Sequence, residues 1–252
     1  MINPYFKIQS YIANYLCLEI APLNRPYLPK EHPNTRYLDL FSAKELKKHF
    51  KDDVNVNNDE IVEVHYIHKG QPYKKLMKGT KFGLIIASHV VEHVPNLIGW
   101  LNDIESVLHD DGIVQFAIPD KRYCFDFRRR LTDISDIIGA YLEDRKKPAP
   151  GIVYEHFLYV PNEICNDPIK HHNGEVSHEF HITKEYHELA LHFAKESLHK
   201  YIDTHCWVWT PESFIKLMGI LYDNKLIKLR VIEEETKFTE VNSYEFYITM
   251  KK

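Results

Sequence analysis

The sequence predicts a doubly wound α/β fold with a mostly parallel sheet of seven strands. Short apolar runs alternate with segments of helical periodicity through the first half of the chain. The run at 82–87 is apolar throughout, as expected for a strand buried on both faces of a parallel sheet. Strands that alternate with helices form right-handed βαβ units, which place the strands parallel.

Five apolar runs predict the strands of the first half, at 15–20, 36–40, 61–67, 82–87 and 113–118. The first crossover contains four prolines between positions 21 and 36, so it is predicted to be irregular and not helical. Ser42 and Glu45 have the spacing of a capping box and begin a helix after the second strand. Apolar residues at 97, 101, 104 and 108 predict a helix before the fifth strand.

Strand alternation stops after the fifth strand, and helical segments appear near 134–142 and 186–201. This region predicts a helical insertion that acts as a lid. Thr210-Pro211 begins a last helix, because Thr is a good N-cap and Pro suits the first helical position. Two final runs, 226–233 and 244–250, predict an antiparallel hairpin at the sheet edge.

The chain is therefore divided into three parts. Residues 1–126 are expected to form a cofactor-binding α/β core. Residues 127–205 are expected to form the insertion, with the lid and an acceptor site. Residues 206–252 are expected to complete the core with the last helix and the hairpin.

Composition excludes several classes of protein. The net charge of −4 over 252 residues gives no basic field for nucleic acid. No apolar run is as long as a membrane span, and the N-terminus lacks the layout of a signal peptide. Four widely spaced cysteines indicate reduced thiols in a cytoplasmic protein.

Two acidic residues end the first two strands. Glu19 ends the first, and Asp39 ends the second twenty residues later. In an open α/β sheet ligands bind beyond the carboxyl ends of the strands, and an acid at this spacing can bind both ribose hydroxyls of an adenosine cofactor. An Asp after a strand is also an ordinary turn residue. The sequence lacks a GxGxxG phosphate cradle, which favours a cofactor without a pyrophosphate.

Five segments distributed along nearly the whole chain carry a family resemblance. They are LEIAPLNRP (18–26), YLD (37–39), ASHVVEHVP (87–95), IPDKRY (118–123) and HCWVWTPESF (205–214). With these segments the chain resembles the class I methyltransferases, and among them a bacterial group associated with surface-polysaccharide (capsule) biosynthesis. The resemblance implies a Rossmann-like fold and S-adenosylmethionine as cofactor.

The resemblance also assigns residues to the cofactor. It implies that Glu19 and the turn of Ala21 and Pro22 contact the methionine end, and that Asp39 holds the ribose. It implies that Ser88 and His89 line the cofactor cleft.

Two positions depart from the family pattern. The usual glycine of the first turn is Ala21, which adds a methyl group where backbone and cofactor approach. The acid expected beside the adenine, near the end of the third strand, is replaced by His65.

The acceptor site is expected in the insertion and in the IPDKRY segment (118–123) at the end of the fifth strand, which we call the strand-five block. The candidate catalytic residues are Asp120, Arg122, Tyr123, His156 and His205. A hydroxyl acceptor benefits from a general base, for which His205 or His156 would serve. Arg122 would suit an acceptor with phosphate or carboxylate. Alternatively, Asp120 and Arg122 form a solvated turn, and His205 is a core histidine beside two tryptophans.

These residues predict an O-methyltransferase that acts on a sugar or a sugar-linked group, including phosphate-type groups. The expected partner is a small-molecule or glycan-linked acceptor, and the oligomeric state stays open. A non-catalytic subunit that keeps the fold and a nucleotide-dependent oxidoreductase are the alternatives. The sequence assigns no metal site, although His171, His172, His178 and His181 lie close together and could bind a divalent ion.

Overall fold

The computed structural model describes residues 6–160, 170–171, 173–176, 179, 181–235 and 244–252. A single sheet of seven strands forms the centre, in the order β3-β2-β1-β4-β5-β7-β6. The strands are β1 (Cys17–Ile20), β2 (Thr35–Asp39), β3 (Tyr66–Ile67), β4 (Phe82–Ser88), β5 (Leu108–Pro119), β6 (Arg230–Glu235) and β7 (Glu245–Lys251). The helices are α1 (Ile8–Ile12), α2 (Ala43–His49), α3 (Tyr73–Leu76), α4 (Leu97–Val107), α5 (Ile134–Leu142), α6 (Pro150–Tyr159), α8 (Lys184–Glu196) and α9 (Pro211–Asp223).

The pairing of the strands confirms the predicted fold class. Strands β1 to β5 pair in parallel, and β7 pairs antiparallel with both β5 and β6. Strands β2 and β3 are added on one side of β1, and β4 and β5 on the other side. The boundary between β1 and β4 is therefore the switch point where ligands bind in open α/β folds. The first crossover contains no helix, as its prolines predicted.

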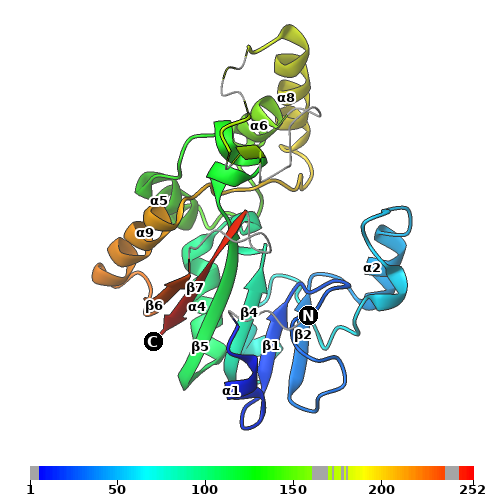
Figure 1. Ribbon diagram of the computed structural model, residues 1–252, viewed down its shortest axis with the longest axis vertical. Coiled ribbons are helices and arrows are strands. Elements are labelled where there is room, and N and C mark those ends of the chain that lie inside the picture. Colours follow the sequence, from blue (N-terminus) through cyan, green and yellow to red (C-terminus); the bar gives the residue numbers. More distant parts are fainter. Residues whose placement is uncertain (1–5, 161–169, 172, 177–178, 180, 236–243) are drawn as a thin grey trace.

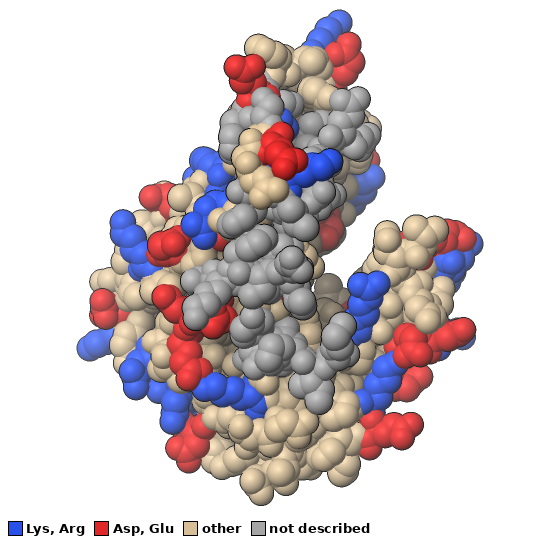
Figure 2. All heavy atoms as spheres, in the orientation of Figure 1, with Lys and Arg blue, Asp and Glu red and all other residues tan. Residues whose placement is uncertain are grey.

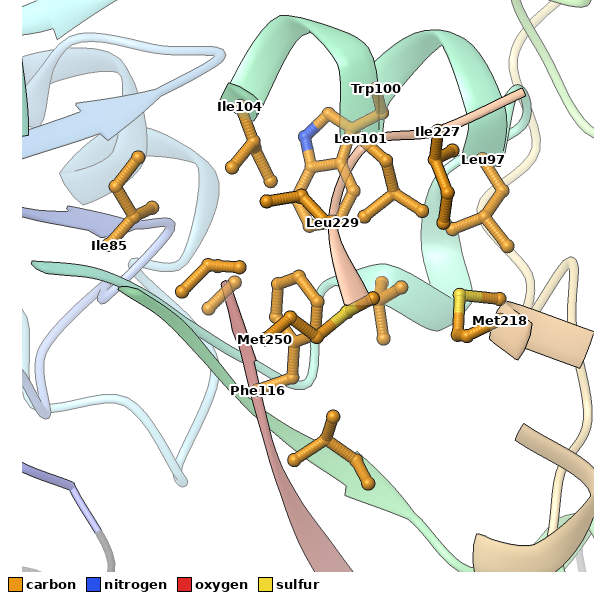
Figure 3. Packing of buried hydrophobic residues seen from close by; sticks show 14 of the residues in the cluster. Ile85, Leu97, Trp100, Leu101, Ile104, Phe116, Met218, Ile227, Leu229 and Met250 are labelled. Atoms are coloured by element: carbon orange, nitrogen blue, oxygen red, sulfur yellow. The ribbon is translucent and has the colours of Figure 1, made fainter. Parts of the chain in front are cut away.

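Helix α4 packs its apolar face on the sheet and forms much of the core (Figure 3). Trp100 stacks on Phe116 of β5 with a centroid distance of 5.6 Å, and its indole N–H donates to the Tyr73 hydroxyl at 2.9 Å. Leu101 and Ile104 are fully buried in the same core cluster. This packing fixes the central strands, and therefore the positions at which β4 and β5 end.

Two predicted strands have different bounds in the structure. The run 61–67 yields only the two residues of β3, because Ile61 instead packs with Ala43 and Leu46 of α2. Strand β5 begins at Leu108, although Asp110, Asp111 and Gly112 are turn-forming residues. A register shift opposite Phe82 and Leu84 of β4 accommodates these extra residues.

The insertion contains α5, α6 and α8 and rises above the carboxyl ends of the strands (Figure 1). Helices α6 and α8 pack together, with Phe157 stacked on Phe193 at 4.0 Å. The predicted helix at 186–201 ends at Glu196 in the structure. The division of the chain into a core, an insertion and a last part, with boundaries at residues 126 and 205, stays a prediction. No helix in the described part of the chain is long and apolar enough to cross a membrane.

Replacing Leu101 by Ala tests the α4 packing. The side chain is fully buried, so its removal leaves a cavity and should lower the free energy of unfolding by about 2–5 kcal/mol. Leu142→Ala is the matched control, because Leu142 is 77% exposed and should change stability by less than about 0.5 kcal/mol. Urea unfolding measures both. Equal losses for the two variants would contradict the packing of α4.

Candidate functional site

The carboxyl ends of β1, β2 and β4 bring predicted cofactor residues together. Ile20 is level with Leu38 of β2 and with Ala87 of β4. The next residues along the same register are Ala21, Asp39 and Ser88. The Ala21 N–H donates to the Leu38 carbonyl at 2.8 Å, which holds the start of the turn against β2. The structure therefore brings these three residues to one edge of the sheet, and their contact with the cofactor stays a prediction.

The turn after β1 has a left-handed backbone without glycine. Ala21 has a φ of 52° and Leu23 a φ of 50°. Residues other than glycine rarely adopt this backbone conformation, and those that do are concentrated at functional sites. Leu23 packs its side chain against the small apolar cluster at α2, whereas Ala21 is exposed. Pro22, between them, accepts a hydrogen bond from the Arg25 N–H at 3.1 Å.

Asp39 has one carboxylate oxygen that is free for a ligand. Its Oδ1 accepts the N–H groups of Leu40 at 2.6 Å and Phe41 at 3.2 Å. No hydrogen bond among the described residues uses Oδ2. Burial raises the pKa of Asp39, while the two backbone N–H groups oppose that shift. The side chain is thus oriented by its own turn and presents one acceptor to the edge of the sheet.

Glu19 shapes the turn from inside the protein. Its two oxygens accept the N–H groups of Tyr27 at 2.9 Å and Leu28 at 2.8 Å. Burial raises the pKa of Glu19 to about 7, against the effect of these two donors. A direct contact between Glu19 and a cofactor would require one of these hydrogen bonds to be replaced, so the contact stays a prediction.

His65 immediately precedes β3 and lies two residues before the end of that strand. Its Nδ1 accepts the Tyr37 N–H at 3.1 Å, which places it two residues before the level of Asp39. A role of His65 beside the adenine stays a prediction. His68 follows the end of β3, and its N–H donates to the Asp39 carbonyl at 2.8 Å.

His89 lies between two carboxylates directly after β4. Its Nε2 is 2.5 Å from Glu245 Oε2, and its Nδ1 is 3.5 Å from Glu92 Oε1. Burial opposes the charged form, but the two carboxylates outweigh it and raise the pKa of His89 to about 10. The backbone φ of 53° is again left-handed. His89 therefore adds a positive charge to this edge.

The strand-five block forms a turn whose polar groups pair within the protein. Asp120 is buried and accepts Arg122 Nε at 3.0 Å and Arg122 Nη2 at 2.6 Å. The same carboxylate caps the short helix Lys121–Tyr123 by accepting the Arg122 N–H. The Arg122 guanidinium lies 5.4 Å from the Tyr123 ring centroid. A catalytic role for these three residues stays a prediction.

His205 is oriented by a buried aspartate. Its Nδ1 is 2.5 Å from Asp126 Oδ2, and the other Asp126 oxygen accepts Arg129 Nη1 at 2.8 Å. Burial alone would raise the pKa of Asp126, but His205 and Arg129 lower it to about 2. An ionised carboxylate only accepts, so the proton of the pair lies on Nδ1 of His205. The Nε2 of His205 is left available to a ligand.

Glu92 and His93 lie beside His205. The His93 and His205 rings are 4.7 Å apart and nearly perpendicular. His93 Nδ1 is 3.1 Å from Asp203 Oδ1, and His93 Nε2 is 4.0 Å from Glu92 Oε1. Glu92 is fully buried, and neither of its oxygens accepts a hydrogen bond from the described residues.

Backbone hydrogen bonds hold these distant residues together. The N–H groups of Cys206 and Trp207 donate to the Glu92 carbonyl at 2.6 and 3.3 Å. The Trp207 indole N–H donates to the Val94 carbonyl at 2.7 Å. The segment before α9 is thereby fixed against the short helix η2 (Val91–His93), which follows β4.

His156, on α6, joins this cluster from the insertion. Its ring centroid is 6.1 Å from that of His205. Burial, with a contribution from Arg129, lowers the pKa of His156 to about 3, so it is neutral near pH 7. Its buried Nδ1 has no hydrogen-bond partner in the described structure. The structure brings His156 and His205 together, and their role in an acceptor site stays a prediction.

The sequence analysis did not assign roles to several members of this cluster, namely Glu92, His93, Asp126, Arg129 and Asp203. Glu92 and His93 stand in the quoted ASHVVEHVP segment, which was the available signal. The other three lie outside the quoted segments. Figure 2 shows the surface hollowed between the lobe of the insertion and the part that carries α2, at the edge where β1, β2 and β4 end.

Comparison with known proteins decides the family. Residues 34–219 match the family model described as a methyltransferase domain, which is about three quarters of the chain. The chain belongs to this family. It is a methyltransferase, and S-adenosylmethionine is its cofactor. The search of curated proteins gives no match.

Several solved structures are similar to this chain at low sequence identity. The CcbJ methyltransferase from Streptomyces caelestis is 10% identical over 97% of this chain and 91% of its own, with a TM-score of 0.45. PKMT2 from Rickettsia typhi, in complex with AdoHcy, is 14% identical over 95% and 49%, with a TM-score of 0.40. A structure from Rhodobacter sphaeroides, named as a zinc-dependent alcohol dehydrogenase, is 10% identical over 96% and 88%, with a TM-score of 0.48.

The residues of the methyltransferase fit an adenosine cofactor at the carboxyl edge. Asp39 Oδ2 has no protein partner among the described residues and is an acceptor of the kind that binds ribose hydroxyls. The left-handed turn at Ala21 is exposed, so the methionine end of the cofactor can approach its backbone. These residues, with Ser88 and His89, would hold the cofactor.

Asp39→Asn should weaken binding of S-adenosylhomocysteine at least tenfold. Asn keeps an oxygen for the N–H groups of Leu40 and Phe41 but loses the charge, and a charge-assisted hydrogen bond contributes about 1.5–3 kcal/mol. Calorimetry measures the affinity. Asp52→Asn is the control, since the Asp52 side chain is 86% exposed in a distant loop. Unchanged affinity in a folded Asp39→Asn protein would show that the cofactor lies elsewhere.

Ala21→Gly should stabilise the methyltransferase, because glycine adopts the left-handed conformation without a Cβ penalty. The expected gain in free energy of unfolding is up to about 1 kcal/mol. Affinity for S-adenosylhomocysteine should stay equal or rise. The same change at Ala190, in the interior of α8, is the control and should destabilise by about 1 kcal/mol. If Ala21→Gly is as destabilising as Ala190→Gly, the turn is not strained.

Proposed function

We propose that the protein is an O-methyltransferase that acts on a hydroxyl of a sugar or sugar-linked group, in surface-polysaccharide biosynthesis. The methyltransferase family supports the reaction. The resemblance of the five quoted segments supports the sugar class and the pathway. The partner is a small-molecule or glycan-linked acceptor, and the buried free thiols of Cys17, Cys124 and Cys206 suit the cytoplasm.

The reaction is a displacement at carbon. S-adenosylmethionine supplies an electrophilic methyl group, whose bond to sulfur breaks as the acceptor oxygen bonds to carbon. The protein contributes alignment and a site that excludes water. A neutral hydroxyl must also lose its proton, which makes an activating group valuable.

The pair of His205 and Asp126 is the observation that carries the proposal. Asp126 fixes the tautomer of His205, so the lone pair on Nε2 is available to activate an acceptor. The pair lies between the end of β4 and the insertion, beside Glu92 and His93. An acceptor oxygen beside this nitrogen would be close to the carboxyl edge where the cofactor residues lie.

A phosphate-type acceptor is the second candidate, and Arg122 is the residue that would favour it. The geometry disfavours this role, because three hydrogen bonds engage the guanidinium with Asp120, and Glu212 lies 3.9 Å away. An arginine whose charge is already compensated binds an anion less well. We therefore prefer the neutral hydroxyl.

His205→Ala should lower turnover about 10²–10⁴-fold, which is the range for loss of a positioned activating group. Transfer of labelled methyl from S-adenosylmethionine to a panel of sugars, sugar phosphates and nucleotide sugars identifies the acceptor and measures the rate. Affinity for S-adenosylhomocysteine should be retained. His156→Ala should have a smaller effect, because a histidine with a pKa of about 3 is a weak base.

Arg122→Ala separates the two acceptor classes. With a hydroxyl acceptor, its Michaelis constant and turnover should stay near those of the wild type. With an anionic acceptor, the Michaelis constant should rise strongly while His205→Ala keeps most of its activity. If all three variants behave like the wild type, the acceptor site is not in this cluster.

A further inference from the structure

Three side chains of the buried cluster have the arrangement of metal ligands. Glu92, His93 and His205 each offer one ligand atom, and these atoms lie within 4.8 Å of one another. Two imidazoles and one carboxylate form a set that commonly binds divalent transition metals in proteins. These residues come from two segments more than a hundred positions apart, so the group is not a local loop.

Both histidines are oriented as metal-bound histidines are. Asp126 engages Nδ1 of His205, and Asp203 engages Nδ1 of His93. Both Nε2 atoms are therefore left as acceptors. Histidine ligands in metal sites usually donate their other ring N–H to a carboxylate in this way, which fixes the tautomer and raises ligand basicity.

Glu92 supplies an independent observation. Its side chain is 1% exposed, and both oxygens are buried without a hydrogen bond from the described residues. The nearest imidazole nitrogens are His89 Nδ1 at 3.5 Å and His93 Nε2 at 4.0 Å. A buried carboxylate without hydrogen bonds is costly unless it is paired or coordinates a metal, and His89 pairs with Glu92 only at this longer distance. A cation between Glu92 and the two Nε2 atoms would add the close partner that its oxygens lack.

We propose that Glu92, His93 and His205 bind one divalent transition-metal ion, with Asp126 and Asp203 as the supporting outer carboxylates. Imidazole ligands favour Fe²⁺, Co²⁺, Ni²⁺ or Zn²⁺ over Mg²⁺ and Ca²⁺. Three protein ligands leave coordination positions open. The His93 side chain is 32% exposed, which gives the ion a path from solvent.

The role of the ion rests on the proposed function, whereas its binding does not. An acceptor hydroxyl on an open position would have its pKa lowered and its oxygen held for attack on the methyl group. Its proton would leave to solvent, and the sulfur of the cofactor would take the electrons of the broken bond. His205 would then activate the acceptor through the ion.

Titration of the metal-free full-length protein with Co²⁺ tests the binding. Visible absorption of bound Co²⁺ and calorimetry should report one ion per chain. His93→Ala and Glu92→Gln should each weaken binding at least tenfold. Asp203→Asn is the mildest variant, because its side chain is 63% exposed, and loss of an outer carboxylate typically costs about 10–100-fold in metal affinity.

His199→Ala is the matched control. It removes an exposed histidine in the turn that follows α8, and it should leave both affinity and stoichiometry unchanged. Far-UV circular dichroism and S-adenosylhomocysteine affinity report whether each variant is folded. These two readouts also test the methyltransferase site without the metal.

Absence of Co²⁺ binding by the wild type would overturn the inference. Binding that is unchanged in His93→Ala, Glu92→Gln and Asp203→Asn would also overturn it, since the ion would then lie at other histidines. If S-adenosylhomocysteine binds in either case, the proposed methyltransferase function stands. Loss of metal affinity in the folded ligand variants, with His199→Ala unchanged, is the result that we expect.

Discussion

The hydrogen bonds from the Cys206 and Trp207 N–H groups to the Glu92 carbonyl are the constraint on which the buried site depends. They join the segment before α9 to the short helix after β4, across more than a hundred residues. With this contact in place, His205 lies beside His93, and Asp126 and Asp203 can orient the two rings. Without it, Glu92 and His93 would lack His205 as a neighbour.

The sheet supplies the frame for two adjacent sites with different chemistry. At the end of β2, the Asp39 carboxylate is a hydrogen-bond acceptor that suits the ribose of a cofactor. At the end of β1, the turn has a left-handed backbone, which suits the methionine end. At the ends of β4 and β5, ionisable side chains are buried and paired. The first site holds a group in place, and the second is equipped to change the protonation of an acceptor. The transfer of a methyl group needs both at one edge.

Electrostatic compensation explains how so many charges are buried together. Arg129 is 2% exposed and is engaged by Asp126 and Glu155, at 2.8 and 3.1 Å. His89 is similarly engaged by Glu245. Ion pairs of this kind offset the cost of burial only when their hydrogen bonds are satisfied. Arg129 meets this rule only in part, because its Nε has no partner in the described structure, and Glu92 departs from it, because neither of its oxygens has a hydrogen-bond donor there.

Periodicity, capping and strand-end acids in the sequence determined the fold class, the irregular first crossover and the edge where Asp39, Ala21 and Ser88 meet. These features follow from local residue order and from parallel strands sharing one carboxyl edge. Tertiary structure alone decided that Glu92, His93 and Asp126 join His205, since their contacts depend on how the segment before α9 docks on η2. It also decided that β3 is short, because Ile61 packs against α2 instead of continuing a strand. Long-range packing of this kind leaves no period or spacing in the chain.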